Sequence, residues 1–141
     1  MTEAEAADWL YEKVTAAGVD DLTMGDLEKQ LDRQTLEIRR RVLERLTQDA
    51  ADREEFGCPK CGRMLNVTAH NRLRTVDSIF GTIGFTRSYG RCSHCGDQVY
   101  PADVALGLHN HARTSPRMQE ICAVAVLGSP AYMSPEQAKG E

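Results

Sequence analysis

Two pairs of cysteines constrain this chain more than any other feature. Each pair is separated by two residues and followed by glycine, as Cys58-Pro59-Lys60-Cys61-Gly62 and Cys92-Ser93-His94-Cys95-Gly96, with thirty residues between the pairs. A tight turn brings both sulfurs of a pair to one side, and glycine accepts the positive φ that suits such a turn. The pattern predicts that four thiolates bind one structural zinc ion and leave no open position for catalysis. The predicted ligands are Cys58, Cys61, Cys92 and Cys95.

Other uses of these cysteines remain open on the sequence alone. Disulfides need an oxidising compartment, and the first residues, Met1-Thr2-Glu3-Ala4-Glu5, show no basic or apolar part of an export signal, so we expect a cytoplasmic protein with reduced thiols. A rubredoxin-like iron electron carrier uses similar cysteine turns, although the segment between the pairs is rich in Arg and Thr rather than in aromatic residues. A redox dithiol explains two symmetrical pairs less simply than one closed site does.

Charge is distributed unevenly along the chain. The formal net charge is −4, yet residues 57–100 carry two acids and six bases, whereas residues 1–56 carry 15 acids and eight bases. Four thiolates on one zinc ion contribute about −2, so the positive excess of the cysteine region is small and local. No apolar run approaches the ~20 residues that cross a bilayer, and we expect no membrane partner.

Residues 1–56 are predicted to form an acidic helical region. Thr2 and Glu5 make a capping-box pattern before a helix over residues 3–17 that ends at Gly18. A second helix, capped by Asp21 or Thr23, is expected to run to about residue 51 with an apolar stripe. At about 1.5 Å per residue it is about 42 Å long, more than a small ribbon can cover. We therefore expect a helical hairpin or an antiparallel dimer, with Trp9 in the core.

Between the cysteine pairs the apolar period changes to two, which predicts a β-hairpin. Residues 72–79 and 82–91 are the expected strands, joined at Phe80-Gly81. Four arginines on these strands are candidate contacts to the phosphates of double-stranded DNA, and the alternative is that they protect the edge of a short sheet. They are Arg72, Arg74, Arg87 and Arg91. The triplet Arg39-Arg40-Arg41 on the second helix also suggests DNA contact. Ion pairs of Arg41 with Glu37 and of Arg40 with Glu44, each four residues apart, are the favoured interpretation.

The predicted fold class is α+β, with four segments. They are a helical pair over residues 1–56, a zinc ribbon of two cysteine knuckles and a hairpin over 57–100, a loop and C-terminal helix over 101–127, and a loose tail over 128–141. Ser115 and Pro116 are suited to cap and begin the C-terminal helix. Within it, the fifth cysteine, Cys122, is expected to be a buried small hydrophobe.

In chain order these features resemble the N-terminal region of bacterial insertion-sequence transposases of the ISKra type. The resemblance covers residues 20–127 and includes both cysteine knuckles, the Arg-Ser-Tyr strand, Tyr100-Pro101-x-Asp103, Leu106-Gly107-Leu108 and Ser115-Pro116. It implies a zinc ribbon that helps to engage the DNA ends of the element, followed in relatives by an RNase H-like nuclease with carboxylate-bound magnesium. The 141 residues leave no length for that nuclease, so we expect no enzyme activity from them.

Residues 128–141 are similar to the segment around the Ala-Pro-Glu motif of bacterial Ser/Thr kinases, but the other kinase motifs are missing. The sequence therefore favours a non-catalytic, truncated transposase fragment that recognises transposon ends in DNA. The alternative is a zinc-stabilised interaction module that forms a homodimer, or binds and regulates a transposase, through the long helix. The iron electron carrier is the third possibility.

Overall fold

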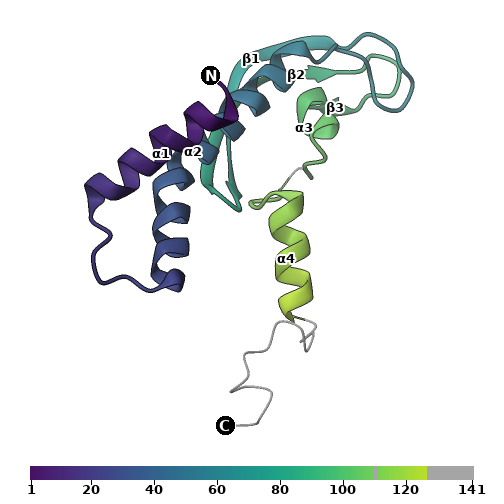
Figure 1. The fold of residues 1–141 in the computed structure, drawn as a ribbon. Helices are drawn as coiled ribbons and strands as arrows, with labels where there is room; N and C mark the ends of the chain where they lie inside the picture. The colour runs from purple at the N-terminus through teal and green to yellow at the C-terminus, as the bar shows by residue number, and fades with distance from the viewer. Residues whose placement is uncertain (110, 127–141) are drawn as a thin grey trace. The chain divides into compact units, whose positions relative to one another are not determined.

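The computed structural model of the chain describes residues 1–109 and 111–126 (Figure 1). It confirms the α+β class, with a three-stranded antiparallel sheet in the order β1-β2-β3. The elements are α1 (Glu3–Ala17), α2 (Met24–Arg53), β1 (Asn66–Ser78), β2 (Gly81–Arg91), β3 (Gln98–Val99), α3 (Pro101–Ala105) and α4 (Pro116–Val126). None of the described helices is both long and apolar enough to cross a membrane. The tail predicted over residues 128–141 lies outside the described residues.

The chain divides into two compact units, Met1–Leu43 and Glu44–Glu141, which we call the helical unit and the sheet unit. The division falls inside α2, whereas the sequence suggested a boundary at residue 56. The reason is that the last ten residues of α2, beginning at Glu44, include side chains that bond to strand β2. The end of the long helix is therefore part of the sheet unit.

In the helical unit, side-chain caps fix where both helices begin. The backbone N–H of Glu5 donates to Thr2 Oγ1 at 3.1 Å, and the N–H of Thr2 donates to Glu5 Oε2 at 2.8 Å, which confirms the predicted capping box. Thr23 and Asp26 make the same reciprocal pair at the start of α2. These bonds satisfy backbone donors that no helical carbonyl can reach. The prediction for Trp9 is wrong, because 41% of the residue is exposed and Lys13 Nζ lies 5.8 Å from its ring centroid.

In the sheet unit, β1 begins six residues earlier than the sequence indicated. The register between β1 and β2 shifts between Val67 and Ala69 and again between Ala69 and Arg72. Asn71 has a φ of 52° inside the second irregularity. Such β-bulges interrupt the alternation of buried and exposed residues on which a strand prediction depends. The second strand ends at Arg91 as predicted and starts at Gly81, one residue earlier than predicted.

One edge of β2 is closed by side chains of α2. The primary amide of Gln48 accepts from the N–H of Thr86 at 2.8 Å and donates to the carbonyl of Thr86 at 3.0 Å, as a neighbouring strand would. Glu44 Oε2 accepts from the N–H of Gly84 at 2.8 Å. These bonds satisfy backbone groups that would otherwise face solvent on an open strand.

The core of the sheet unit lies on one face of the hairpin. Val76, Ile83 and Phe85 are buried there, each at 5% exposure or less. They share this face because paired residues of adjacent strands point to the same side, and Val76 pairs with Ile83. Beside the cysteine turns, a smaller cluster joins Cys58, Leu65 and Cys92, with Phe56 and Val99 packed against it.

Gly90 is expected to be intolerant of any side chain. A Cβ at this position would lie 2.9 Å from Leu65 Cβ and 3.3 Å from the carbonyl oxygen of Asn66. Because both neighbours are close to the backbone, Gly90→Ala should lower the free energy of unfolding by about 1–3 kcal/mol, the usual cost of overpacking. The matched variant Gly84→Ala, whose nearest neighbour is Leu73 Cδ1 at 3.5 Å, should cost less. Denaturant unfolding of both variants measures the difference, and equal losses would contradict it.

Candidate metal centre

The two cysteine turns have the same backbone structure. In the first, the N–H of Cys58 donates to the carbonyl of Arg63 at 2.7 Å, and the N–H of Gly62 donates to the carbonyl of Cys58 at 2.8 Å. In the second, Cys92 bonds in the same way to Asp97 at 2.9 Å, and Gly96 bonds to Cys92 at 2.7 Å. The two glycines have φ values of 74° and 76°, which confirms that the turns need the left-handed conformation.

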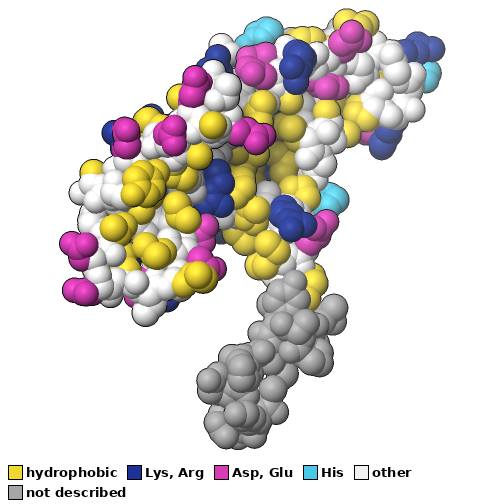
Figure 2. Space-filling model, viewed as in Figure 1, with side chains coloured by type: hydrophobic (Ala, Val, Ile, Leu, Met, Phe, Trp, Pro, Cys, Tyr) yellow, Lys and Arg dark blue, Asp and Glu magenta, His cyan; other side chains and the backbone are white. Residues whose placement is uncertain are grey.

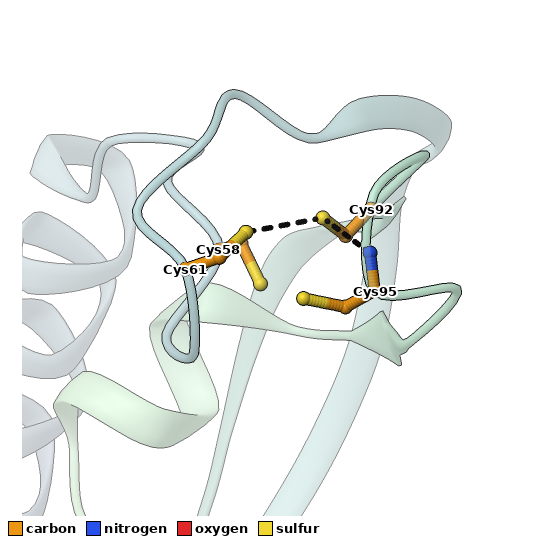
Figure 3. A group of neighbouring side chains, drawn as sticks. All are labelled: Cys58, Cys61, Cys92 and Cys95. Carbon is orange, nitrogen blue, oxygen red and sulfur yellow. Dashed lines mark hydrogen bonds between the residues drawn. The ribbon is translucent and has the colours of Figure 1, made fainter.

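These turns bring the four predicted ligand sulfurs together (Figure 3). All four Sγ atoms lie within 4.8 Å of one another, and those of Cys61 and Cys92 are 3.5 Å apart. A tetrahedral zinc ion with Zn–S bonds of about 2.3 Å requires sulfurs about 3.8 Å apart, so the cluster has the dimensions of a four-thiolate metal site. All four cysteines are free thiols here, and no disulfide joins them. The group Cys58, Cys61, Cys92 and Cys95 can therefore hold a metal ion.

Contacts within the cluster shift the pKa values of two of the thiols in opposite directions. The backbone N–H of Cys95 donates to Cys92 Sγ at 3.4 Å and lowers the pKa of Cys92 to about 6. A hydrogen bond with Cys61, with desolvation adding to it, raises the pKa of Cys95 to about 12. Four adjacent sulfurs cannot all become anionic unless a cation shares their charge. A divalent ion does this by displacing protons, so metal binding at this site should weaken as the pH falls.

An ion pair joins the two turns beside the sulfurs. Lys60 Nζ, in the first turn, lies 2.6 Å from Asp97 Oδ2, just after the second. The hydrogen bond with Asp97 raises the pKa of Lys60, and the nearby Cys95 and Cys58 act in the same direction. Lys60 therefore remains a cation next to a cluster that becomes anionic on binding a metal.

Two of the four predicted DNA-contacting arginines are buried. Arg74 Nη1 lies 2.8 Å from Asp103 Oδ2, and Arg87 Nε lies 3.0 Å from Asp103 Oδ1. The side chains of Arg74, Arg87 and Asp103 are only 7%, 8% and 3% exposed. This prediction is therefore corrected: in this conformation Arg74 and Arg87 are bound to Asp103 and cannot reach a phosphate.

Arg74, Arg87 and Asp103, which we call the buried triad, connect the segment after β3 to the hairpin. Arg74 Nη2 donates to the carbonyls of His109 and Ala112, both at 2.7 Å. Arg87 Nη1 donates to the carbonyl of Arg72 at 2.9 Å, and its guanidinium carbon lies 3.7 Å from the ring centroid of Tyr100. Sequence reasoning missed this structural role of Asp103, although an acid within the apolar run after Tyr100-Pro101 was a signal that could have found it.

The other two predicted arginines, Arg72 and Arg91, are exposed. Arg63, directly after the first cysteine turn, is also exposed and was not among the predicted contacts. Cys122 is exposed on α4, so the prediction that it is buried is wrong. Its helix begins as expected, since the N–H of Met118 donates to Ser115 Oγ at 3.1 Å.

The arginine triplet of α2, Arg39-Arg40-Arg41, includes the ion pair between Glu37 and Arg41 that the sequence predicts. Glu37 Oε1 lies 2.7 Å from Arg40 Nη2 and 3.0 Å from Arg41 Nε. Hydrogen bonds from Arg40 and Arg41 lower the pKa of Glu37 to about 2. Helical ion pairs therefore account for this part of the arginine run.

Comparison of the chain with the models of known protein families, with curated proteins and with solved structures finds no match. The candidate metal centre is therefore defined by its own geometry: four sulfur ligands in two equivalent turns at one end of a β-hairpin.

Proposed function

We propose that this protein is a zinc-folded module that binds duplex DNA, as the end-recognition part of a transposase. The observation that carries the proposal is the convergence of four Sγ atoms within 4.8 Å of one another. A closed set of four thiolates is typical of structural zinc rather than of a catalytic metal, which needs an open ligand position. The transposase context is supported by the resemblance of the motifs over residues 20–127.

The identity of the metal separates this proposal from an electron carrier. Four sulfurs in a tetrahedron suit both zinc and iron. Elemental analysis of the purified full chain should find one equivalent of zinc in a colourless protein. A coloured protein with one equivalent of iron and a reversible reduction would instead support the rubredoxin-like alternative.

The proposed DNA surface contains three exposed arginines of the sheet unit, Arg63, Arg72 and Arg91. Figure 2 shows Lys, Arg and His side chains at the end of the sheet that carries the cysteine loops. In the register of the sheet, Arg91 pairs with Asn66, which follows the first cysteine turn by four residues. Arg63 lies two residues after Cys61, and Arg91 directly precedes Cys92. Loss of the ion should therefore displace both arginines.

Salt-dependent binding tests this surface. Fluorescence anisotropy of the metal-loaded chain with duplex DNA should give an affinity that falls as salt rises, with a slope of about 0.9 per phosphate bound. Replacing Arg63, Arg72 and Arg91 together with Gln should weaken binding and lower that slope by about 0.9 for each arginine that binds a phosphate. The control Arg41→Gln changes an exposed arginine that is paired with Glu37 and should leave the slope unchanged. A slope near zero for the native protein, or an unchanged slope for the triple variant, would reject the proposal.

A second function, as an interaction module, is favoured by exposed apolar residues of α2. Ile38, Val42 and Leu46 are 42%, 52% and 59% exposed and recur at intervals of four residues. This row of side chains lies on one face of the helix and could pair with a second α2 or with a transposase. Sedimentation of the native chain and of Val42→Ser should show a dimer that the substitution dissociates. A monomer at all concentrations would contradict the homodimer.

A further inference from the structure

The helical unit contains an apolar groove between its two helices. The groove has a volume of about 560 Å³, and its lining includes Leu10, Tyr11 and Val14 of α1, Val19 of the connecting turn, and Leu27 and Leu31 of α2. We call this the hairpin groove. Tyr11 and Leu31 are 70% and 43% exposed, so the groove opens to solvent.

The helical unit has almost no closed core of its own. Val14 is the only buried side chain in residues 1–43, all of which the structure describes. Two helices pack stably in water only when an apolar face is covered, which in helical bundles takes a third or fourth helix. The hairpin groove is therefore an uncovered apolar surface of the kind that a further helix covers in a helical bundle.

Exposed acids outnumber bases on the helix rows next to the lining of the hairpin groove, where Lys13, three residues after Leu10, is the one base. Asp8 lies three residues before Tyr11, and Glu12 lies three residues before Thr15, so both are on rows of α1 that adjoin the lining. Glu28 lies three residues before Leu31 on α2 in the same way. All three carboxylates are exposed, and among the described residues no Lys or Arg lines the groove. Figure 2 shows hydrophobic side chains gathered on the α1–α2 hairpin, with acidic side chains and some Lys or Arg side chains around them.

We infer that the hairpin groove binds an amphipathic helix of a protein partner, with a row of apolar side chains flanked by Lys or Arg. The apolar row would bury the surface of Tyr11 and Leu31, and the flanking cations would meet Asp8, Glu12 and Glu28. A second copy docked groove to groove would instead place like carboxylates against each other, which opposes that pairing. The inference is independent of DNA binding, because it uses no residue of the sheet unit.

Two matched synthetic peptides test the inference on the full, metal-loaded chain. Both form an amphipathic helix with Leu along one face, and the flanking positions are Lys in one and Glu in the other. Fluorescence anisotropy should show the Lys peptide binding at least about tenfold more tightly than the Glu peptide, a ratio that corresponds to about 1.4 kcal/mol. Added salt should reduce this preference because the charges are exposed.

Substitutions assign the binding to the groove. Leu31→Ser should weaken binding of the Lys peptide about tenfold, whereas Leu36→Ser, at a leucine of 42% exposure outside the lining, should not change it. Replacing Asp8, Glu12 and Glu28 with Lys should reverse the preference in favour of the Glu peptide. Equal binding of the two peptides, or equal effects of the two serine variants, would overturn the inference. So would a dimer of the native chain that Leu31→Ser dissociates, since a second copy would then occupy the groove.

Discussion

Loss of the metal ion is expected to unfold the sheet unit. The cluster beside the cysteine turns contains three buried residues, and two of them, Cys58 and Cys92, are candidate ligands. Structural zinc binds with about 10–16 kcal/mol in small domains, which equals or exceeds the roughly 5–15 kcal/mol that keeps a typical domain folded. Adding a strong chelator, or replacing Cys58 with Ser, should therefore abolish the hydrogen-exchange protection of the amides of β1 and β2.

The fifth cysteine provides the matched control for that experiment. Cys122 is exposed on α4 and is not part of the sulfur cluster. Cys122→Ser should keep one equivalent of metal and full protection of the hairpin amides. If the metal-free chain kept that protection, the ion would not be the element that folds the sheet unit, and the proposal of a zinc-folded module would be wrong.

Replacing Asp103 is expected to have the largest effect on stability of any substitution away from the cysteines. Asp103→Asn preserves the shape of the side chain but removes the only acid that Arg74 and Arg87 share in the described structure. Breaking a buried ion pair and leaving a charge without its partner typically costs about 3–5 kcal/mol. Chemical denaturation of the metal-loaded protein should show a loss of this size.

Two further variants separate burial from charge. Asp97→Asn makes the same chemical change at the ion pair between Asp97 and Lys60. The side chains of Lys60 and Asp97 are 72% and 40% exposed, so this substitution should cost much less stability than Asp103→Asn. Replacing the whole triad with apolar residues of similar size should restore much of the stability lost in Asp103→Asn. A small loss in Asp103→Asn, similar to that in Asp97→Asn, would show that the triad contributes little.

Local sequence signals predicted the features that depend on neighbouring residues. Thr2 caps the helix that its capping-box pattern indicates, and the glycines after both cysteine pairs adopt the positive φ that the turns need. The cysteine spacing also predicted which sulfurs come together, because each turn brings its own pair to one side and the hairpin returns the second pair to the first.

Features that depend on distant partners could not be predicted in this way. Arg74 and Arg72 are two residues apart on one strand, yet one is buried against Asp103, 29 residues away, while the other is exposed. An arginine carries the same charge in both environments, so composition and alternation do not distinguish them. The early start of β1 was missed for another reason, since the bulge at Asn71 breaks the period of two.

The bonds from Glu44 and Gln48 to β2 have a consequence for any attempt to isolate the sheet unit. A fragment that begins at residue 57, just ahead of the first cysteine, would lack both side chains and would leave the N–H groups of Gly84 and Thr86 exposed on an open strand edge. Exposed strand edges are sites at which separate molecules pair through backbone hydrogen bonds and aggregate. We therefore expect a fragment that keeps the final turns of α2 to aggregate less than one that begins at residue 57.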